Sequence, residues 1–192
     1  MSYFANAAQL LLEFAFGAAV TLFVLRILAE LWRVQFQNPV SQFLYRYSNP
    51  VLAPVRRIIP NWGRINLAAA LVALVLELVK LGMEFALHGM LPRPVGWLVL
   101  GLGQLLDMTM LIYIVLVFGW SLSSLVGGDT RHPLLRFVSQ LVEPPLLPLR
   151  RRMPTMGGLD FSPAVAILVL FLLRILVAQP IIDLGAHLAV AG

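Results

Sequence analysis

Charged side chains interrupt the long apolar runs of this 192-residue chain, at matched positions in its two halves. Glu13 and Lys80 in the first half correspond, 94 positions later, to Asp107 and Arg174. Because pairing lowers the cost of charge in lipid, we expect an acid–base pair in each half. Glu77, one turn from Lys80, is a competing partner. Such groups either hold helices together or snorkel to the surface, and the functional alternative is that they line a path for protons or ions.

Two segments rich in arginine and proline repeat the same offset of 94 residues without a gap. They run from Asn38 to Asn66 and from His132 to Asp160, and we call them the first and second elbows. Arginines beside an anionic leaflet gain about 1 kcal/mol per charge, which would anchor the elbows to lipid headgroups. The alternative is a docking surface for a cytoplasmic protein or a specific anionic lipid. The arginines concerned are Arg56, Arg57, Arg150, Arg151 and Arg152.

Each elbow begins with the i, i+3, i+4, i+7 pattern of a short amphipathic helix. Asn38 is a suitable N-cap before Pro39. Helices of about nine residues are too short to cross a bilayer and fit its interface instead. The apolar positions are Val40, Phe43, Leu44 and Tyr47 in the first elbow and Leu134, Phe137, Val138 and Leu141 in the second.

Prolines and glycines are expected to shape the rest of each elbow. A proline lacks a backbone N–H and restricts the residue before it, so we expect no continuous helix through these positions. The second elbow ends in a Gly-Gly turn, after which Asp160 or Ser162 is expected to cap the next helix. The shaping residues are Pro50, Pro54, Pro60, Pro144, Pro148, Pro154, Gly157, Gly158, Asp160, Ser162 and Pro163.

The composition indicates a membrane protein. Hydrophobic residues make up 60% of the chain and charged residues 12%, with a mean hydropathy of +0.88. The net charge of +5 comes from arginines beside apolar runs, a pattern that favours a membrane surface over specific nucleic acid. With no cysteine and no catalytic or metal-binding motif, we expect neither an enzyme nor a cofactor.

Four apolar stretches are long enough to be transmembrane helices, which predicts an all-α membrane fold. The two halves, residues 1–94 and 95–192, are expected to be parallel tandem repeats, each with two such helices joined by a cytoplasmic elbow. Arg26, Glu30 and Glu84 are interpreted as helix-end residues that snorkel. The four stretches are Ala7–Leu31, Leu67–His88, Trp97–Ser121 and Pro163–Ile182.

Loop charge predicts the orientation. The segments Trp32–Asn66 and Val126–Ser162 carry five arginines each, whereas the opposite side carries Arg93 alone. The positive-inside rule therefore places both elbows in the cytoplasm and both termini in the periplasm.

The elbow motifs resemble those of the YggT family of small membrane proteins. The second elbow matches through Pro144, Pro148, Arg150, Arg151, Pro154, Gly157, Gly158, Asp160, Ser162 and Pro163, and the first through Asn38, Pro39, Phe43, Pro50, Pro54, Arg56, Arg57, Pro60 and Gly63. The resemblance implies a multi-pass protein of the bacterial inner membrane without known catalytic residues. Its relatives are linked to cell division or nucleoid organisation, to osmotic-stress tolerance, and in plastids to haem attachment on a cytochrome b-type subunit.

Together these observations predict a non-enzymatic membrane scaffold or assembly factor, whose basic elbows hold an anionic lipid or a protein partner. The alternative is a small ion or solute pathway linked to osmotic stress. A pathway would require a homo-oligomer, because four helices enclose little space.

Overall fold

All regular structure in the described part of the chain is helical, which confirms the predicted all-α class. The computed structural model describes residues 3–59, 63–125, 132–152 and 160–190. A short π-helix, η1, interrupts the last rod between α6 and α7. The elements are α1 (Tyr3–Leu31), α2 (Pro39–Arg56), α3 (Leu67–Leu87), α4 (Pro94–Leu125), α5 (Pro133–Arg150), α6 (Ser162–Leu173), η1 (Arg174–Ala178) and α7 (Gln179–Val190).

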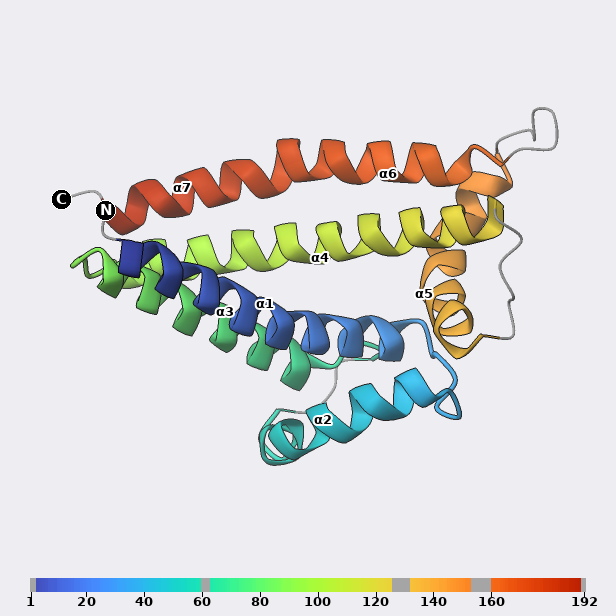
Figure 1. The fold of residues 1–192 in the computed structure, drawn as a ribbon, viewed down its shortest axis with the longest axis horizontal. Helices are drawn as coiled ribbons and strands as arrows, with labels where there is room; N and C mark the ends of the chain where they lie inside the picture. Colours follow the sequence, from blue (N-terminus) through green and yellow to red (C-terminus); the bar gives the residue numbers. More distant parts are fainter. Residues whose placement is uncertain (1–2, 60–62, 126–131, 153–159, 191–192) are drawn as a thin grey trace.

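The long helices form two hairpin-like pairs. Helix α1 packs along α3, and α4 packs along the rod made of α6, η1 and α7. Both chain termini lie at one end of the molecule, which we call the terminal end (Figure 1). The shorter helices α2 and α5 lie at the opposite end, which we call the elbow end.

Three of the helices are long and apolar enough to cross a membrane, which is compatible with a membrane protein. They cover Asn6–Leu31, Pro94–Ser124 and Ser162–Val190. The 21-residue helix α3 is not among them, because its second half contains three charged residues, Glu77, Lys80 and Glu84.

The two elbow helices have matched bounds. Helix α2 spans Pro39–Arg56 and α5 spans Pro133–Arg150, so their first and last residues are each 94 positions apart. Each has 18 residues, about twice the length expected from the amphipathic pattern.

The expectation that prolines prevent a continuous helix is wrong. Helix α2 contains Pro50 and Pro54, and α5 contains Pro144, Pro145 and Pro148. Pro50 and Pro54 lie one turn apart on the exposed side of α2, where freed carbonyls can bond to water. An interior proline costs about 3 kcal/mol, and each fully buried apolar side chain returns about 1.5–3 kcal/mol. Packing on the opposite face therefore offsets much of the local preference.

That packing face differs between the two elbows. In α5 the predicted Phe137 and Leu141 are buried. In α2 the buried face is Ser41, Leu44, Ser48 and Leu52, whereas the predicted Phe43 and Tyr47 are more than half exposed. The first elbow therefore turns aromatic side chains away from the protein, where a membrane interface can accept them.

Glycines allow α4 and the last rod to approach closely. A Cβ at Gly185 would lie 2.4 Å from the Leu100 backbone nitrogen, and one at Gly96 would lie 2.1 Å from the Ala189 nitrogen. Small residues at such crossings are a common device for packing helices in membranes. The absence of a side chain at these positions thus determines how closely the second pair of helices packs.

Replacing Gly185 by alanine should destabilise the protein by about 1–3 kcal/mol, because the new methyl group collides with the backbone of α4. Gly119→Ala is a matched control in α4, since a Cβ there meets nothing within 4 Å. The control should be neutral or up to about 1 kcal/mol more stable, as expected for alanine in a helix. Unfolding in detergent micelles measures both variants. Equal stabilities would contradict the close approach.

Candidate functional site

A bidentate ion pair joins α4 to the rod made of α6, η1 and α7. Arg174 donates from Nε to Asp107 Oδ1 at 2.7 Å and from NH2 to Oδ2 at 2.8 Å. The two side chains are 25% and 23% exposed. This geometry fixes both groups, because the planar guanidinium matches the carboxylate. The acid–base pair predicted for the second half of the chain is therefore confirmed.

Arg174 also begins the π-helix. The Gln179 N–H donates to the Arg174 carbonyl five residues earlier, so the turn is one residue wider than an α-helical turn. Pro180 follows directly, and in a regular helix its ring would crowd the carbonyl of Leu176. The wider turn relieves that crowding at the point where the ion pair forms.

The pair expected in the first half does not form. Lys80 Nζ lies 2.5 Å from Oε1 of Glu77, which is 3% exposed. Glu13 is exposed on α1 and accepts a hydrogen bond from Gln9 at 3.1 Å. The prediction failed because a partner one turn away on the same helix needs no particular angle between helices.

A buried charge cluster joins α1 to the first elbow. Arg26 is only 1% exposed, although the sequence suggested a snorkelling residue. It lies 2.7 Å from Glu30, which also accepts a 2.8 Å hydrogen bond from Arg56. The Arg26 guanidinium stacks over the Tyr45 ring, 3.2 Å from its centre. Packing of α2 over the end of α1 thus turns an expected surface charge into a buried one.

In the second elbow, Arg150 finds its acid in the following segment. Its Nε donates to Asp160 Oδ2 at 2.7 Å, while Oδ1 of Asp160 accepts from the Ser162 N–H at 2.9 Å. Desolvation raises the pKa of Asp160, but the hydrogen bonds from Ser162 and the charge of Arg150 outweigh it and lower this pKa below its usual value. Asp160 thus binds the first residue of α6, but the expectation that Asp160 or Ser162 is the N-cap is wrong, because Phe161 is the N-cap and Ser162 is already helical.

The two elbows use equivalent arginines but opposite sources of acid. Arg56 pairs with Glu30 from the preceding helix, whereas Arg150 pairs with Asp160 from the following segment. The positions equivalent to these acids carry Ser124 and Asn66. Arg57, Arg151 and Arg152 are exposed. Two of the five arginines predicted to bind a partner or lipid are thus paired with acids of the same chain, and the other three are exposed.

The elbows also contact each other. Asn38 accepts from the Val40 N–H at 2.8 Å, which confirms its capping role, and donates to the Pro133 carbonyl at 2.7 Å. The Gln35 N–H donates to the side chain of Gln140 at 2.8 Å. Spacing within one elbow predicts the cap, but it carries no signal for these bonds to the other elbow.

Of the remaining predicted residues, the structure describes some and leaves others outside the described ranges. Pro163 lies buried in the first turn of α6 beside Ser162, which is 1% exposed. Asn66 caps α3 by accepting from the Ala69 N–H at 3.0 Å, so the start of that helix is well determined. Pro60, Pro154, Gly157 and Gly158 lie outside the described residues.

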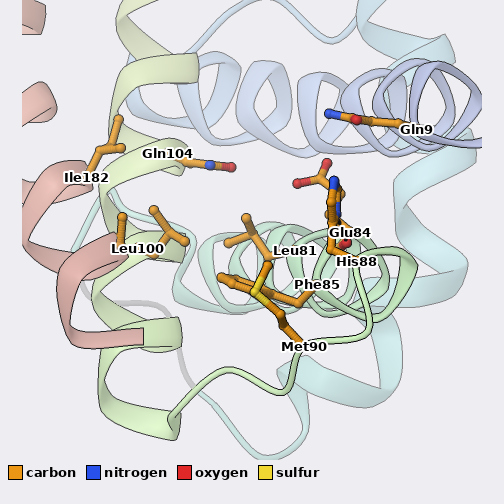
Figure 2. A pocket seen from close by; sticks show the side chains of 10 residues that line it. Gln9, Leu81, Glu84, Phe85, His88, Met90, Leu100, Gln104 and Ile182 are labelled. Carbon is orange, nitrogen blue, oxygen red and sulfur yellow. Dashed lines mark hydrogen bonds between the residues drawn. The ribbon is translucent and has the colours of Figure 1, made fainter. Parts of the chain in front are cut away.

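A cavity of about 350 Å³ at the terminal end was not predicted from the sequence. All four long rods line it (Figure 2). Its polar side chains include Gln9 from α1, Glu84 from α3 and Gln104 from α4. Figure 2 shows Gln104 directed toward the Glu84 carboxylate from the opposite side of the cavity, with Gln9 on the same side as Glu84. These residues come from three separate helices, so no local spacing could have grouped them.

Asp107→Asn should destabilise the protein by about 1.5–3 kcal/mol, because it leaves the Arg174 charge without its carboxylate. Glu13→Gln is the matched control from the equivalent position, and we expect it to change stability by less than about 0.5 kcal/mol. Unfolding in detergent micelles measures both.

Exchange of the two charges, Asp107→Arg with Arg174→Asp, should recover part of the loss caused by either single change. If the exchanged protein is no more stable than the worse single variant, the ion pair does not hold the two helices together.

The chain resembles proteins of several bacteria. A profile of the CCB3/YggT family matches twice, at residues 5–87 and 99–181, with starts 94 positions apart.

The uncharacterized protein YggT of Escherichia coli K12 is 34% identical over 172 residues, covering 88% of this chain and 89% of its own. An uncharacterized protein of Pseudomonas aeruginosa is 34% identical over 178 residues, covering 90% and 89%. One from Vibrio alginolyticus is 36% identical over 170 residues, covering 87% and 89%. No solved structure matches. The matched elbows, the duplicated profile and the extent of these similarities establish that the chain belongs to the CCB3/YggT family.

Proposed function

We propose that this protein is a non-enzymatic scaffold or assembly factor of the bacterial inner membrane. In this proposal four helical rods cross the bilayer as two parallel tandem repeats. The elbows lie at the cytoplasmic surface, where they hold an anionic lipid or an acidic protein partner. Both termini lie in the periplasm.

The case for a fourth span rests on α3, whose charges keep it out of a simple hydropathy count. Its most buried acid, Glu77, is paired with Lys80, and the helix packs along α1. An acid with a nearby base can be accommodated inside a membrane bundle. Helix α3 has 21 residues, which is long enough to cross the hydrocarbon layer.

Equivalent residues also lie in equivalent cores. Phe23 and Leu52 are buried together with α3 residues in the first half. Their counterparts 94 positions later, Val117 and Leu146, are buried together with Ala166 of α6 in the second half. This supports a duplicated unit in which each elbow helix packs against its own pair of long helices.

The observation that carries the proposal is the surface of the elbow end. Arg57, Arg151 and Arg152 are exposed there, together with the aromatic side chains of Phe43 and Tyr47. Two acids near them, Glu30 and Asp160, are already occupied by arginines. Exposed arginines beside aromatic rings suit an anionic membrane surface or an acidic segment lying on it.

A second candidate is a small oligomeric ion or solute pathway. The cavity at the terminal end favours it, because such a cavity would supply an entrance. The bidentate pair between Arg174 and Asp107 lies deeper along the same helices and would control the path. Flux through proteoliposomes that is abolished by Asp107→Asn would favour this candidate over the scaffold.

The orientation can be tested with single cysteines, because the natural chain has none. A membrane-impermeant thiol reagent should label Ala53→Cys only from the cytoplasmic side, since Ala53 is exposed on α2. It should label Pro94→Cys, exposed at the terminal end, only from the periplasmic side. Labelling of both residues from one side would refute the proposed topology.

Replacing Arg57, Arg151 and Arg152 by glutamine should weaken binding at the elbow surface by roughly 3 kcal/mol, about 1 kcal/mol per charge. The measurement is mass spectrometry of the anionic lipids and proteins that stay with the chain in mild detergent.

Arg151→Gln alone and Arg93→Gln at the other end form a matched pair of single changes. Only Arg151→Gln should reduce what is retained. Unchanged lipid and protein retention in the triple variant would rule out the elbow surface as the binding site.

A further inference from the structure

The cavity at the terminal end has the features of a binding site for a positively charged group. Its lining combines an apolar wall, which includes Leu81, Leu100 and Ile182, with the carboxylate of Glu84. Its lining contains one basic side chain, the imidazole of His88, and no lysine or arginine. Ligand sites in proteins typically have this combination of an apolar pocket and a few convergent polar groups.

Glu84 is available as a counter-ion. Its carboxylate takes part in no ion pair or side-chain hydrogen bond within the described ranges. Two bases lie one turn away along the chain: Lys80, which lies 2.5 Å from Glu77, and His88, whose Nδ1 lies 2.8 Å from the backbone carbonyl oxygen of Glu84. A partly buried carboxylate without a partner favours a cation from outside the chain.

Two amide groups complete a set of acceptors. Gln9 donates its Nε2 to Glu13, which leaves its Oε1 free to accept a hydrogen bond. Gln104 has no hydrogen-bond partner among the residues that the structure describes, and Figure 2 shows it directed into the same space as Glu84. The carboxylate and two amide oxygens provide three acceptors, which match the three N–H donors of a primary ammonium group.

We propose that this cavity binds a primary ammonium group, with Glu84 as its counter-ion and Gln9 and Gln104 as hydrogen-bond acceptors. The apolar wall holds the aliphatic part of the ligand. The same chemistry is offered by the headgroup of an aminophospholipid and by a free alkylamine. An inorganic metal ion fits less well, because no group of three metal-ligating side chains occurs in the described residues. The site lies at the opposite end from the elbows, so it does not depend on their proposed role.

The test uses the full chain, purified in an uncharged detergent. Butylammonium chloride is the free-amine probe, with butanol and equal potassium chloride as references. Phosphatidylethanolamine is the lipid probe, compared with phosphatidylglycerol. We expect butylammonium to raise the unfolding temperature where butanol and potassium do not, or native mass spectrometry to show retained phosphatidylethanolamine that butylammonium displaces. The first result alone indicates a free amine, and the second indicates a lipid headgroup.

Glu84→Gln should weaken this binding about tenfold or more, as expected when one charge-assisted hydrogen bond is lost. Glu143→Gln is the matched control, because Glu143 is exposed on α5 at the elbow end. Gln104→Leu provides a second variant should Glu84→Gln fail to fold. Binding of neither probe, or equal binding by Glu84→Gln and the natural chain, would overturn the proposal. Stabilisation by potassium alone would overturn it as well.

Discussion

Charge on long apolar helices is the constraint on which the rest of this structure depends. An unpaired charge inside a bilayer costs several kcal/mol, and a buried one inside a protein costs a similar amount. The chain meets this constraint in three ways. Asp107 and Arg174 pair between helices, Glu77 and Lys80 pair within one helix, and Arg26 is enclosed by Glu30 and Tyr45. The first and third solutions fix the position of a rod or an elbow, whereas the second acts within α3 alone.

The elbows show how a duplicated segment can diverge while keeping its shape. The helices α2 and α5 have matched bounds and contain prolines at equivalent positions. Each is tied to the rest of the protein through an equivalent arginine, but Arg56 is held by the helix before it and Arg150 by the segment after it. An arginine can meet either acid because its long side chain reaches both sides of the elbow. The arrangement leaves Arg57, Arg151 and Arg152 free to face an outside partner.

The last rod combines two features that reinforce each other. Gly96 and Gly185 allow the last rod to approach α4 closely. At this short separation, Arg174 donates hydrogen bonds to Asp107 from both Nε and NH2. The π-helix at this point has a local cause in Pro180. The first half has Ala86 at the equivalent position, and α3 is regular throughout.

Local patterns in the sequence determined the helical class, the approximate bounds of the long helices and the cap at Asn38. These follow from hydropathy and from contacts within a few residues. The repeat offset also identified Asp107 and Arg174 as partners, because both halves of the chain repeat the same order of elements. The same reasoning failed for Glu13 and Lys80, since Glu77 lies one turn away.

By itself the sequence thus determined where the long helices lie and which charges need partners. Only the tertiary structure decided which partners they meet and which faces stay exposed. It buried Arg26, carried the elbow helices through their prolines, and brought Gln9, Glu84 and Gln104 to one cavity. The physical reason is that these outcomes depend on the angles and distances between helices. Packing of the whole molecule sets those angles, and the spacing of residues along one helix does not.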